Sequence, residues 1–480
     1  MEYEVVIGLE VHAELSTQTK LLCGCAAEFV REPNTHCCPV CLAMPGTLPR
    51  INKRAVEYAI KAGLALNCDI SEYTRMDRKH YFYPDLPKAY QVTQHYHPLC
   101  KNGYIDIETE DGVRRIGITQ IHLEEDAGKL IHDQYETESL VDYNRSGVPL
   151  IEIVSEPDLR SPEEGRIFLE TIKSILEYID VSDCKMEEGS LRCDVNVSVR
   201  PKGQKEYGVR SEMKNLNSFR AAHRAMEYEV KRHISILEEG GEVLRETRRW
   251  DDNLGKSFPM RTKEEANDYR YFPDADIVPM YIDKEWVTKL KEEMPELPSE
   301  RRERYIKEYD LPEYDAGVLT SSKALADYFE ECLTLYDDPK NISNWVMGDI
   351  LRITKEKDIA HEDISVTPKQ FTDLLRLVDE GIISGSIGKN VLEDMFDTGK
   401  DADTIVEEKG LKQISDEGEL LEIIRKVLQD NPQSVEDYLS GKKKAMGYLV
   451  GQTMRATRGK ANPQMVNKIL KEELDGLKEK

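Results

Sequence analysis

The chain has 480 residues, of which 39% are apolar, and its 66 basic and 91 acidic side chains give a formal net charge of −25. This length suggests roughly two to four domains with real cores, and the ordinary glycine and proline content excludes a disordered or collagen-like chain. The acidic balance argues against a general nucleic-acid coat, and because no apolar run approaches ~18 residues we expect no membrane-spanning segment.

The first half of the chain, to about residue 290, mixes predicted strands with a few predicted helices. Its acidic start, Met1–Glu4, lacks the basic residues of a signal or transit peptide, so we expect a cytoplasmic protein. The predicted strands are Glu4–Val11, Arg115–His122, Leu150–Val154, Leu191–Val199 and Glu206–Lys214. The predicted helices are Arg54–Leu66, Pro162–Ile179 and Ser218–Glu239.

Five of the ten cysteines lie close together, between Cys23 and Cys41. A cytoplasmic chain does not carry a disulfide framework, so this cluster indicates a metal site. The pairs Cys23-x-Cys25 and Cys38-x-x-Cys41 can converge on one tetrahedral Zn²⁺, and four thiolates leave no open position, so the predicted zinc is structural. Cys37 is left out because adjacent cysteines do not easily bind the same ion. The alternative is a loop of unrelated free thiols.

Polar side chains interrupt the apolar strands of the first half at period-two spacing, which places each pair on one sheet face. So many carboxylates repel one another and need cations, and Mg²⁺ is the natural candidate because it prefers oxygen ligands and is shared with substrate phosphates. The sequence has no G-x-x-x-x-G-K-S/T, strand-linked G-x-G-x-x-G or G-x-S-x-G motif. A sheet that holds Mg²⁺ and ATP would perform phosphoryl transfer without a P-loop. The positions are Glu10, His12, Glu152, Asp194, Asn196, Glu212 and Lys214, with Glu124 and Glu125 nearby.

Three cations, Lys79, Arg192 and Lys214, are candidates to contact the phosphates. The alternative is that each polar strand residue simply faces solvent, although Glu152 has apolar neighbours on both sides that suggest burial. Two segments have a similar composition and combine aromatic residues with cations and prolines. They are Asp77–Gln91 and Tyr269–Asp274. Such loops often line ligand clefts, and aromatic core packing is the alternative.

The second half of the chain shows only helical periodicity. A charge-rich stretch, Asp283–Glu308, contains Pro295 and Pro298 and is predicted to be a linker. We expect a second boundary near residue 405. The predicted helical segments are Ser321–Leu335, Ile342–Ile353, Thr367–Glu380 and Glu417–Leu428.

The segment Gly441–Lys468 reverses the charge of the chain, since it has seven basic residues and no acidic one. A basic patch on a small helical module suits a phosphate backbone, and a solubilising helix face is the alternative. The basic residues are Lys442, Lys443, Lys444, Arg455, Arg458, Lys460 and Lys468.

Long motifs distributed along the whole chain carry a resemblance to one family. They include VIGLEVHAEL (6–15), NTHCCPVCLAMPGTLP (34–49), RKHYFYPDLPKAYQVTQ (78–94), LEEDAGK (123–129), DYNRSGVPLIEIVSEPDLRSPEE (142–164), MEEGSLRCDVNVSVRP (186–201), DYRYFPDADI (268–277), SNWVMGD (343–349) and QSVEDYLSGKKKAMGYLVGQTMRATRGKANP (433–463). On these motifs the sequence resembles the B-subunit family of bacterial and archaeal aspartyl/glutamyl-tRNA amidotransferases.

The resemblance implies an α+β protein of three parts. The first, residues 1–293, would be a glutamine synthetase-like cradle that carries the zinc motif at 23–41. The second, residues 294–405, would be an all-helical domain. The third, residues 406–480, would be a small YqeY-like helical tail that contacts tRNA, which favours the tRNA interpretation of the basic segment.

The resemblance also implies a carbon–nitrogen ligase reaction on Glu-tRNA(Gln) or Asp-tRNA(Asn). ATP would convert the side-chain carboxylate into an acyl phosphate, because a carboxylate is a poor electrophile, and ammonia would then displace phosphate. The chain has no amidase-type Ser-Ser-Lys apparatus, so ammonia would come from glutamine through an amidase-like A subunit. A small C subunit would complete a heterotrimer.

The family's site residues are carried over position by position. The magnesium positions match His12, Glu125, Glu152, Asp194 and Glu212, and Glu10, Glu124 and Lys79 belong to the same catalytic pocket. For ATP we expect contacts from Lys79, Arg192, Asp194, Asn196, Glu212 and Lys214. For zinc the matching ligands are Cys23, Cys25, Cys38 and Cys41. For tRNA we expect contacts from Lys442, Lys443, Lys444, Arg455, Arg458 and Lys460.

Three other classes of protein compete with this interpretation. One is the longer archaeal paralogue, the glutamine-specific E subunit, which has an inserted domain. A second is a non-catalytic tRNA-binding scaffold that has kept the fold, against which the intact carboxylates argue. A third is a zinc-dependent hydrolase, which needs an open coordination position that four cysteines do not supply.

Overall fold

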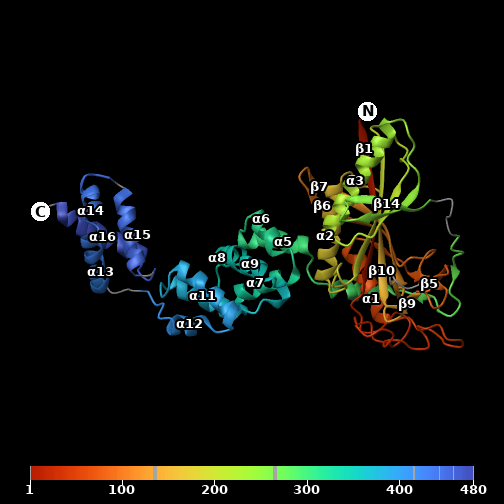
Figure 1. Cartoon of the computed structure of the whole chain (residues 1–480). Coiled ribbons are helices and arrows are strands. Elements are labelled where there is room, and N and C mark those ends of the chain that lie inside the picture. The colour runs from red at the N-terminus through yellow and green to blue at the C-terminus, as the bar shows by residue number, and fades with distance from the viewer. Residues whose placement is uncertain are drawn as a thin grey trace. The chain divides into compact units, whose positions relative to one another are not determined.

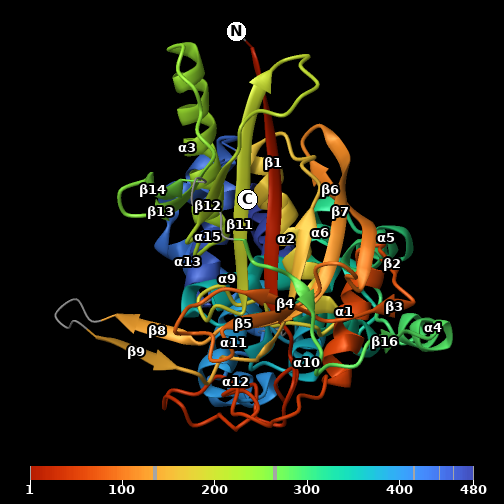
Figure 2. The ribbon, with the colours of Figure 1, turned by 90° about the vertical axis from the view of Figure 1, so that its right-hand side faces the viewer.

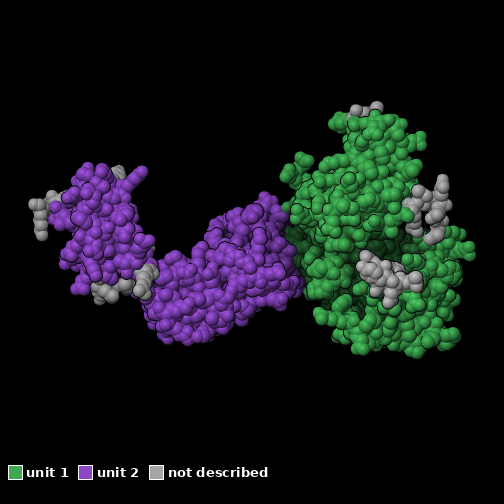
Figure 3. All heavy atoms as spheres, viewed as in Figure 1, with its two compact units in different colours: residues 1–300 green, residues 301–480 purple. Residues whose placement is uncertain are grey.

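The computed structural model describes residues 2–132, 138–262, 268–413, 417–442, 444–457 and 459–478. The chain divides into two compact units, Met1–Glu300 and Arg301–Lys480, which Figure 3 shows in different colours. The division lies near the predicted end of the first domain at residue 293. The further division near residue 405 stays a prediction.

Unit 1 is built on a nine-stranded sheet with the order β14-β13-β12-β11-β1-β10-β7-β6-β2. Neighbouring strands are antiparallel, except that β12 and β13 run parallel. Figure 2 shows the long central strands β1 and β11 side by side. The strands are β1 (Tyr3–Glu14), β2 (Asp69–Ile70), β6 (Cys100–Thr109), β7 (Gly112–Glu125), β10 (Pro149–Ser155), β11 (Leu191–Pro201), β12 (Ser211–Lys214), β13 (Glu246–Asp251) and β14 (Lys256–Thr262).

Three helices cover one face of this sheet: α1 (Lys53–Ala65), α2 (Pro162–Tyr178) and α3 (Phe219–Glu238). Figure 1 shows α2 and α3 alongside the strands. The alternating apolar residues of the central strands, such as Leu9 and Val11, are fully buried in the core beneath them. The three predicted helices of the first half are confirmed to within one residue at each end. The face that these helices leave uncovered carries the polar residues of the strands.

Smaller sheets accompany the large one. The strands β4 (Asp77–His80), β5 (Tyr90–Thr93) and β15 (Phe272–Pro273) form a three-stranded sheet in which β5 packs against β7. The strand β3 (Tyr73–Thr74) pairs with β16 (Met280–Tyr281), and β8 (Lys129–His132) pairs with β9 (Ser139–Asp142). These small sheets bring residues 73–96 and 269–281 together beside the polar face.

The predicted linker Asp283–Glu308 contains the boundary between the two units, but it is regular structure and forms two helices, α4 (Lys284–Glu292) and α5 (Pro298–Tyr309). Pro298 is the first residue of α5, a position where its missing N–H costs no helical hydrogen bond. Tyr305 of α5 is fully buried, so this charge-rich stretch contributes to a core. The strand predicted at Glu206–Lys214 is also shorter than expected, since β12 covers only its last four residues.

All regular elements in the described residues of unit 2 are helices, as the sequence predicted. None of the described helices has the length and apolarity needed to cross a membrane. The last four helices enclose a separate core that includes Leu420, Leu449 and Leu470. The helices are α6 (Glu313–Leu319), α7 (Lys323–Leu335), α8 (Pro339–Trp345), the π-helix η2 (Val346–Ile350), α9 (Leu351–Lys357), the short 3₁₀ helix η3 (His361–Asp363), α10 (Pro368–Asp379), α11 (Gly385–Thr398), α12 (Ala402–Glu408), α13 (Glu417–Asp430), α14 (Pro432–Leu439), α15 (Lys444–Ala456) and α16 (Pro463–Lys478).

Candidate active site and metal centres

The polar face of the nine-stranded sheet gathers charged side chains from adjacent strands. His12 of β1 lies opposite Glu152 of β10, and Glu152 in turn lies opposite His122 of β7. Two residues before His12 on β1, Glu10 lies opposite Asp194 of β11. Residues directly opposite one another in an antiparallel sheet point to the same face, so these five side chains share the face that helices α1 to α3 leave uncovered.

A first group of possible metal ligands consists of His12, Glu124 and Glu152. One ligand atom from each lies within 4.8 Å of the others. His12 Nε2 is 3.3 Å from Glu152 Oε2 and 3.8 Å from Glu124 Oε1. His122 Nε2 approaches the same two carboxylates at 3.2 Å and 3.6 Å, and Thr93 donates to Glu124 Oε2 over 3.2 Å. This first group is therefore a converging set of oxygen and nitrogen ligands.

The electrostatics of the first group follow from its burial. Burial lowers the pKa of His122, but the carboxylates of Glu152 and Glu124 outweigh this effect and raise the pKa to about 10. The pKa of His12 is raised by the same carboxylates against the effect of burial. Burial raises the pKa of Glu152, but the two imidazoles outweigh it and hold that pKa well below its usual value. The carboxylates thus favour the protonated imidazoles, and a cation bound by His12 would displace the proton of that imidazole.

A second group of possible ligands consists of Glu10, Asp194 and Glu212, whose ligand atoms also lie within 4.8 Å of one another. Lys214 Nζ donates to Asp194 Oδ2 and, over 2.9 Å, to Glu212 Oε1. Asn196 Nδ2 donates to Glu10 Oε1 over 3.1 Å. Burial and the neighbouring carboxylates of Glu152, Asp194 and Glu212 raise the pKa of Glu10. The second group therefore holds more negative charge than Lys214 alone balances.

Lys79 of β4 lies close enough to the first group for the charges of that group to act on it. Burial lowers the pKa of Lys79, but the charges of Glu124, Tyr271, Glu152 and Tyr269 together outweigh burial and raise the pKa. Its Nζ also lies 5.1 Å from the centre of the Tyr269 ring and 6.0 Å from that of Tyr81. The predicted pocket lysine is thus brought beside the carboxylates.

Two predicted site residues do not join these groups. Glu125 follows Glu124 in β7 and points to the other side, where its Oε1 accepts from the Val92 N–H over 2.9 Å and its Oε2 from Lys88 Nζ over 2.5 Å. The place expected for Glu125 in the ligand set is taken by Glu124, because alternate residues of a strand share a face. Arg192 lies opposite His12 in the sheet but donates to Asp126 over 2.8 Å.

Sequence reasoning missed His122 as a site residue. The signal for it was present, since His122 and Glu124 have the same period-two spacing as Glu10 and His12. Thr93 and Lys88 carried no such signal, because their contacts depend on how β5 packs against β7.

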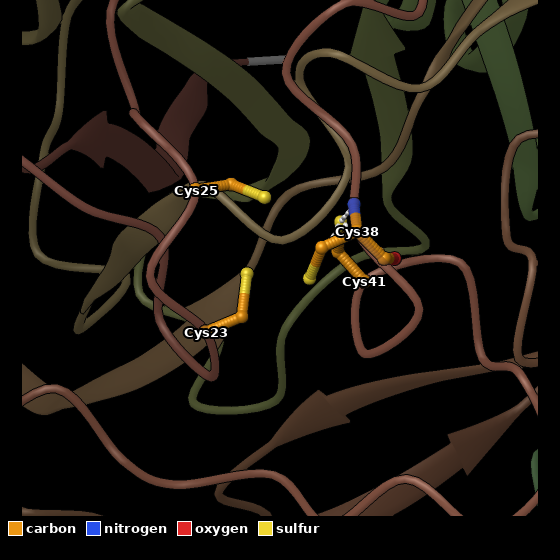
Figure 4. Close-up of side chains that lie close together, drawn as sticks. All are labelled: Cys23, Cys25, Cys38 and Cys41. Carbon is orange, nitrogen blue, oxygen red and sulfur yellow. Dashed lines mark hydrogen bonds between the residues drawn. The ribbon is translucent and has the colours of Figure 1, made fainter.

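The four cysteines predicted to bind zinc converge in unit 1, and Figure 4 shows their sulfur atoms directed toward one another. The four Sγ atoms lie within 4.8 Å of one another, and those of Cys38 and Cys41 are 3.9 Å apart. The hydrogen bond with Cys23 is the main reason that the pKa of Cys41 is lowered to about 4. The ammonium group of Lys20 also lowers it, and that lysine is fully buried with its Nζ 3.2 Å from the Tyr143 carbonyl oxygen.

A cavity of about 250 Å³ lies between the cysteines and the strand β7. Its lining includes Cys23, Cys41, Lys20 and the Lys88–Glu125 ion pair. Glu125 therefore faces this cavity, whereas Glu124 faces the polar sheet surface.

The basic segment of unit 2 is partly described. Lys442 precedes α15, and Lys444 and Arg455 are exposed on α15 itself. Eleven residues are about three turns of helix, so Lys444 and Arg455 share one helix face. Lys460 is half-buried, and Lys443 and Arg458 lie outside the described residues.

Comparisons with known proteins cover nearly the whole chain. Residues 5–288 match the family model described as the GatB/GatE catalytic domain, and residues 327–474 match the one described as the GatB domain. Three curated relatives are named as B subunits of an aspartyl/glutamyl-tRNA(Asn/Gln) amidotransferase. The chain is 62% identical over 478 residues to the one from Caldicellulosiruptor bescii, with 99% of this chain and 100% of that protein covered. It is 61% identical over 474 residues to the one from Thermoanaerobacter sp. strain X514, with 99% and 100% covered. It is 56% identical over 476 residues to the first of the numbered B subunits of Clostridium acetobutylicum, again with 99% and 100% covered.

Proposed function

The chain belongs to the family of aspartyl/glutamyl-tRNA(Asn/Gln) amidotransferase B subunits, and from that premise we propose that its polar sheet face carries the ATP-dependent step of tRNA amidation. Its function is tRNA-dependent amidotransfer, as one subunit of a glutamine-hydrolysing carbon–nitrogen ligase of translation. The glutamine synthetase-like cradle and the YqeY-like tail are likewise proposals, beyond the mixed α/β unit and the helical unit described above.

The proposed reaction has two steps. A carboxylate oxygen of the tRNA-bound glutamate or aspartate attacks the γ-phosphorus of ATP, the bond to ADP breaks, and an acyl phosphate forms. Ammonia then attacks the acyl carbon, the carbon–oxygen bond to phosphate breaks, and the proton lost by ammonia leaves with phosphate. Activation is needed because phosphate is a far better leaving group than an oxide.

The single observation that carries the proposal is the convergence of two acidic groups on one face. Five carboxylates and His12 fit a hard divalent cation, and Mg²⁺ is the one normally shared with nucleotide phosphates. The residues that would hold it are His12, Glu124 and Glu152 in the first group and Glu10, Asp194 and Glu212 in the second. When bound, Mg²⁺ neutralises the negative charge on the phosphates and on the groups being transferred.

The chain's own cations have a complementary role in this proposal. Lys214, between Asp194 and Glu212, and Lys79, beside Glu124, would orient phosphate oxygens while the carboxylates hold the metal. Asn196 keeps Glu10 in place through its side-chain amide. Arg192, about two-fifths exposed and bound to Asp126, would contact a phosphate only by exchanging that partner.

Zinc would have a separate, structural role. Four thiolates around Zn²⁺ leave a net charge of about −2, which is costly inside a protein unless a cation lies nearby. Buried Lys20 supplies such a cation beside Cys41. The four cysteines therefore fit a closed zinc site that stabilises residues 20–49 without taking part in the reaction.

The complete enzyme would need partners. An amidase-type A subunit would release ammonia from glutamine, a small C subunit would hold the other two chains together, and the three chains would form a heterotrimer. The misacylated tRNA, Glu-tRNA(Gln) or Asp-tRNA(Asn), would contact the basic residues Lys442, Lys444, Arg455 and Lys460, which suit a phosphate backbone. Lys443 and Arg458 belong to the same proposal by sequence.

The test is amidation by the complex reconstituted with its amidase-type and small partners and supplied with ammonium chloride in place of glutamine. Ammonium bypasses the amidase, so the assay isolates the chemistry of this chain. We expect amide-bearing tRNA only in the presence of ATP and Mg²⁺, and none with Asp194→Asn. Unchanged product formation by that variant would contradict the assignment of the reaction to this face.

A further inference from the structure

Five aromatic rings form a continuous row beside the proposed active site, which we call the aromatic row. In order they are Tyr81, Tyr269, Tyr271, His95 and Tyr96. Successive ring centres are 6.1, 6.0, 3.9 and 4.8 Å apart. The planes of Tyr271 and His95 are only 8° from parallel. The proposed phosphoryl transfer and amidation use none of these rings.

The backbone holds the outer part of the aromatic row in place. Asp77 of β4 is fully buried, and its Oδ2 accepts from the backbone N–H groups of His95 and Tyr96, each over 2.9 Å. The hydroxyl of Tyr96 donates to the Tyr271 carbonyl oxygen over 3.3 Å. The small sheet pairs β15, which directly follows Tyr271, with β4. The rings are thus fixed by two segments that are about 180 residues apart in the sequence.

One of the two segments that carry the aromatic row lies beside the first ligand group, because Thr93 of β5, which pairs with β4, donates to Glu124 Oε2 over 3.2 Å. Lys79 Nζ lies over the rings of both Tyr269 and Tyr81, at 5.1 and 6.0 Å from their centres. The same lysine experiences the charges of Glu124 and Glu152. The proposed function places the substrate carboxylate at the first ligand group, on the side of the aromatic row where Lys79 lies.

The other end of the aromatic row is open to solvent. Tyr96 is 50% exposed, and His95 is exposed as well. The guanidinium carbon of Arg75 lies 5.8 Å from the centre of the Tyr96 ring. Cations thus accompany the rings at both ends, whereas Asp77 is internal and already bonded.

We propose that the aromatic row binds the unpaired 3′-terminal nucleotides of the aminoacyl-tRNA by stacking and leads the attached amino acid to the carboxylate face. This inference rests on the proposed function, because that function requires a carboxylate esterified to the 3′ end of a tRNA to reach the first ligand group. Bases stack on aromatic side chains with little dependence on base identity, and interleaved cations serve the phosphates. The aromatic row leads from solvent toward the proposed reaction site. Single-stranded RNA can follow such a row base by base, whereas a folded protein surface would not extend along it.

The test compares variants of Tyr271 in the reconstituted complex. Tyr271→Leu removes the central ring, Tyr271→Phe keeps it, and Tyr314→Ala changes an exposed tyrosine of unit 2 as a control. We expect Tyr271→Leu to raise the KM for aminoacyl-tRNA roughly tenfold, in line with the loss of one stacked base, and to leave the KM for ATP unchanged. Tyr271→Phe and Tyr314→Ala should stay within about twofold of the parent chain. If Tyr271→Leu lowers the unfolding temperature, the KM for aminoacyl-tRNA is measured in His95→Ala, which removes the neighbouring ring instead.

A cross-linking experiment tests the same contact independently of the amidation reaction. A tRNA that carries 4-thiouridine among its last three nucleotides is irradiated on the complex, and the cross-linked peptides are identified. We expect peptides from residues 75–96 or 268–276. Cross-links elsewhere, together with an unchanged KM in both ring variants, would overturn the inference. Loss of heterotrimer formation instead of tRNA affinity would overturn it as well, since the row would then be a protein contact. Correct cross-links with no ATP-dependent amidation would support the aromatic row and contradict the proposed function.

Discussion

His12 Nε2 lies 3.3 Å from Glu152 Oε2, although the two residues are 140 positions apart in the sequence. The antiparallel register of β1 and β10 places them directly opposite each other. The same register places Ile151 and Ile153, the neighbours of Glu152, in the buried core. The apolar residues on the buried face of the sheet hold β1 and β10 in this register, and the register holds His12 and Glu152 together on the opposite face. The geometry of the site therefore depends on the sheet and not on a flexible loop.

We expect Glu152→Gln to lower the rate of ammonium-dependent amidation by roughly 100-fold, because one charged ligand of the first group is lost. The measurement is kcat with saturating aminoacyl-tRNA and ATP, and tRNA affinity should be unchanged. Glu170→Gln, an exposed position on α2, is the matched control and should retain full activity. A rate for Glu152→Gln within twofold of the parent chain would exclude Glu152 from the reaction.

Glu124 and Glu125 are adjacent in sequence and face different surroundings, so the same substitution should affect them differently. We expect Glu124→Gln to raise the Mg²⁺ concentration needed for half-maximal activity roughly tenfold, since it removes one anionic oxygen ligand. Glu125→Gln should leave this Mg²⁺ requirement unchanged, because Glu125 bonds to Lys88 and to the Val92 N–H. A shift in the Mg²⁺ requirement for Glu125→Gln alone would show that the first ligand group is assigned to the wrong glutamate.

Zinc should be measurable independently of activity. We expect the purified chain to contain about one zinc ion and Cys41→Ser to lose it, because three thiolates hold a structural zinc poorly. Cys37→Ser is the matched control, since Cys37 is adjacent to Cys38 but does not belong to the four-cysteine group. Elemental analysis and the thermal unfolding midpoint report the two effects. Equal zinc content in both variants would contradict the four-cysteine site.

The charge of α15 should control tRNA affinity without controlling chemistry. We expect the double variant Lys444→Glu/Arg455→Glu to bind tRNA roughly tenfold more weakly at moderate salt and to show a shallower salt dependence, because two phosphate contacts are lost. Lys471→Glu, an exposed change on α16, should have a smaller effect. Binding titrations at several salt concentrations make the measurement. Equal affinity of the double variant and the parent chain would show that this face of α15 does not contact RNA.

A buried ion network on the helix-covered side of unit 1 predicts acid sensitivity. Burial raises the pKa of Glu229 on α3, but hydrogen bonds from His233, Arg232 and Ser257 outweigh it and lower the pKa to about 2. Because the pKa in the folded state is lower than the ordinary value of 4.5, the stabilisation is complete above pH ~4.5 and is lost as pH falls toward 2. Glu229 is fully buried, so the shift corresponds to about 3 kcal/mol.

We therefore expect Glu229→Gln to lower the free energy of unfolding by about 3 kcal/mol at pH 7 and to flatten its dependence on pH below 4.5. Urea unfolding of the full chain at several pH values measures both effects. Glu163→Gln is the control, since Glu163 is about half exposed and water screens its ion pair with Arg166. A parallel loss of stability with pH in Glu229→Gln and the parent chain would assign the acid sensitivity to other groups.

The sequence was most informative where the spacing of apolar and polar residues repeats with the period of a strand or a helix. Alternation along β1 and β11 identified Glu10, His12 and Asp194, and helical periodicity placed α1 to α3 closely. It was least informative where distant segments meet. Whether Glu124 or Glu125 lies on the polar face of the sheet depends on how far β7 continues as a regular strand. The spacing of residues in the sequence does not show where β7 ends. Nor does it show that residues 269–272 lie beside β4.

Glu10 and His12 belong to different ligand groups but to one central strand, which is hydrogen-bonded on both sides. Two residues of an antiparallel strand advance the backbone by about 7 Å, and this distance barely changes in a paired strand. The strand β1 therefore sets the distance between the two ligand groups in advance. A change in the register of β1 would displace Glu10 and His12 together, so both groups depend on the pairing of this one strand.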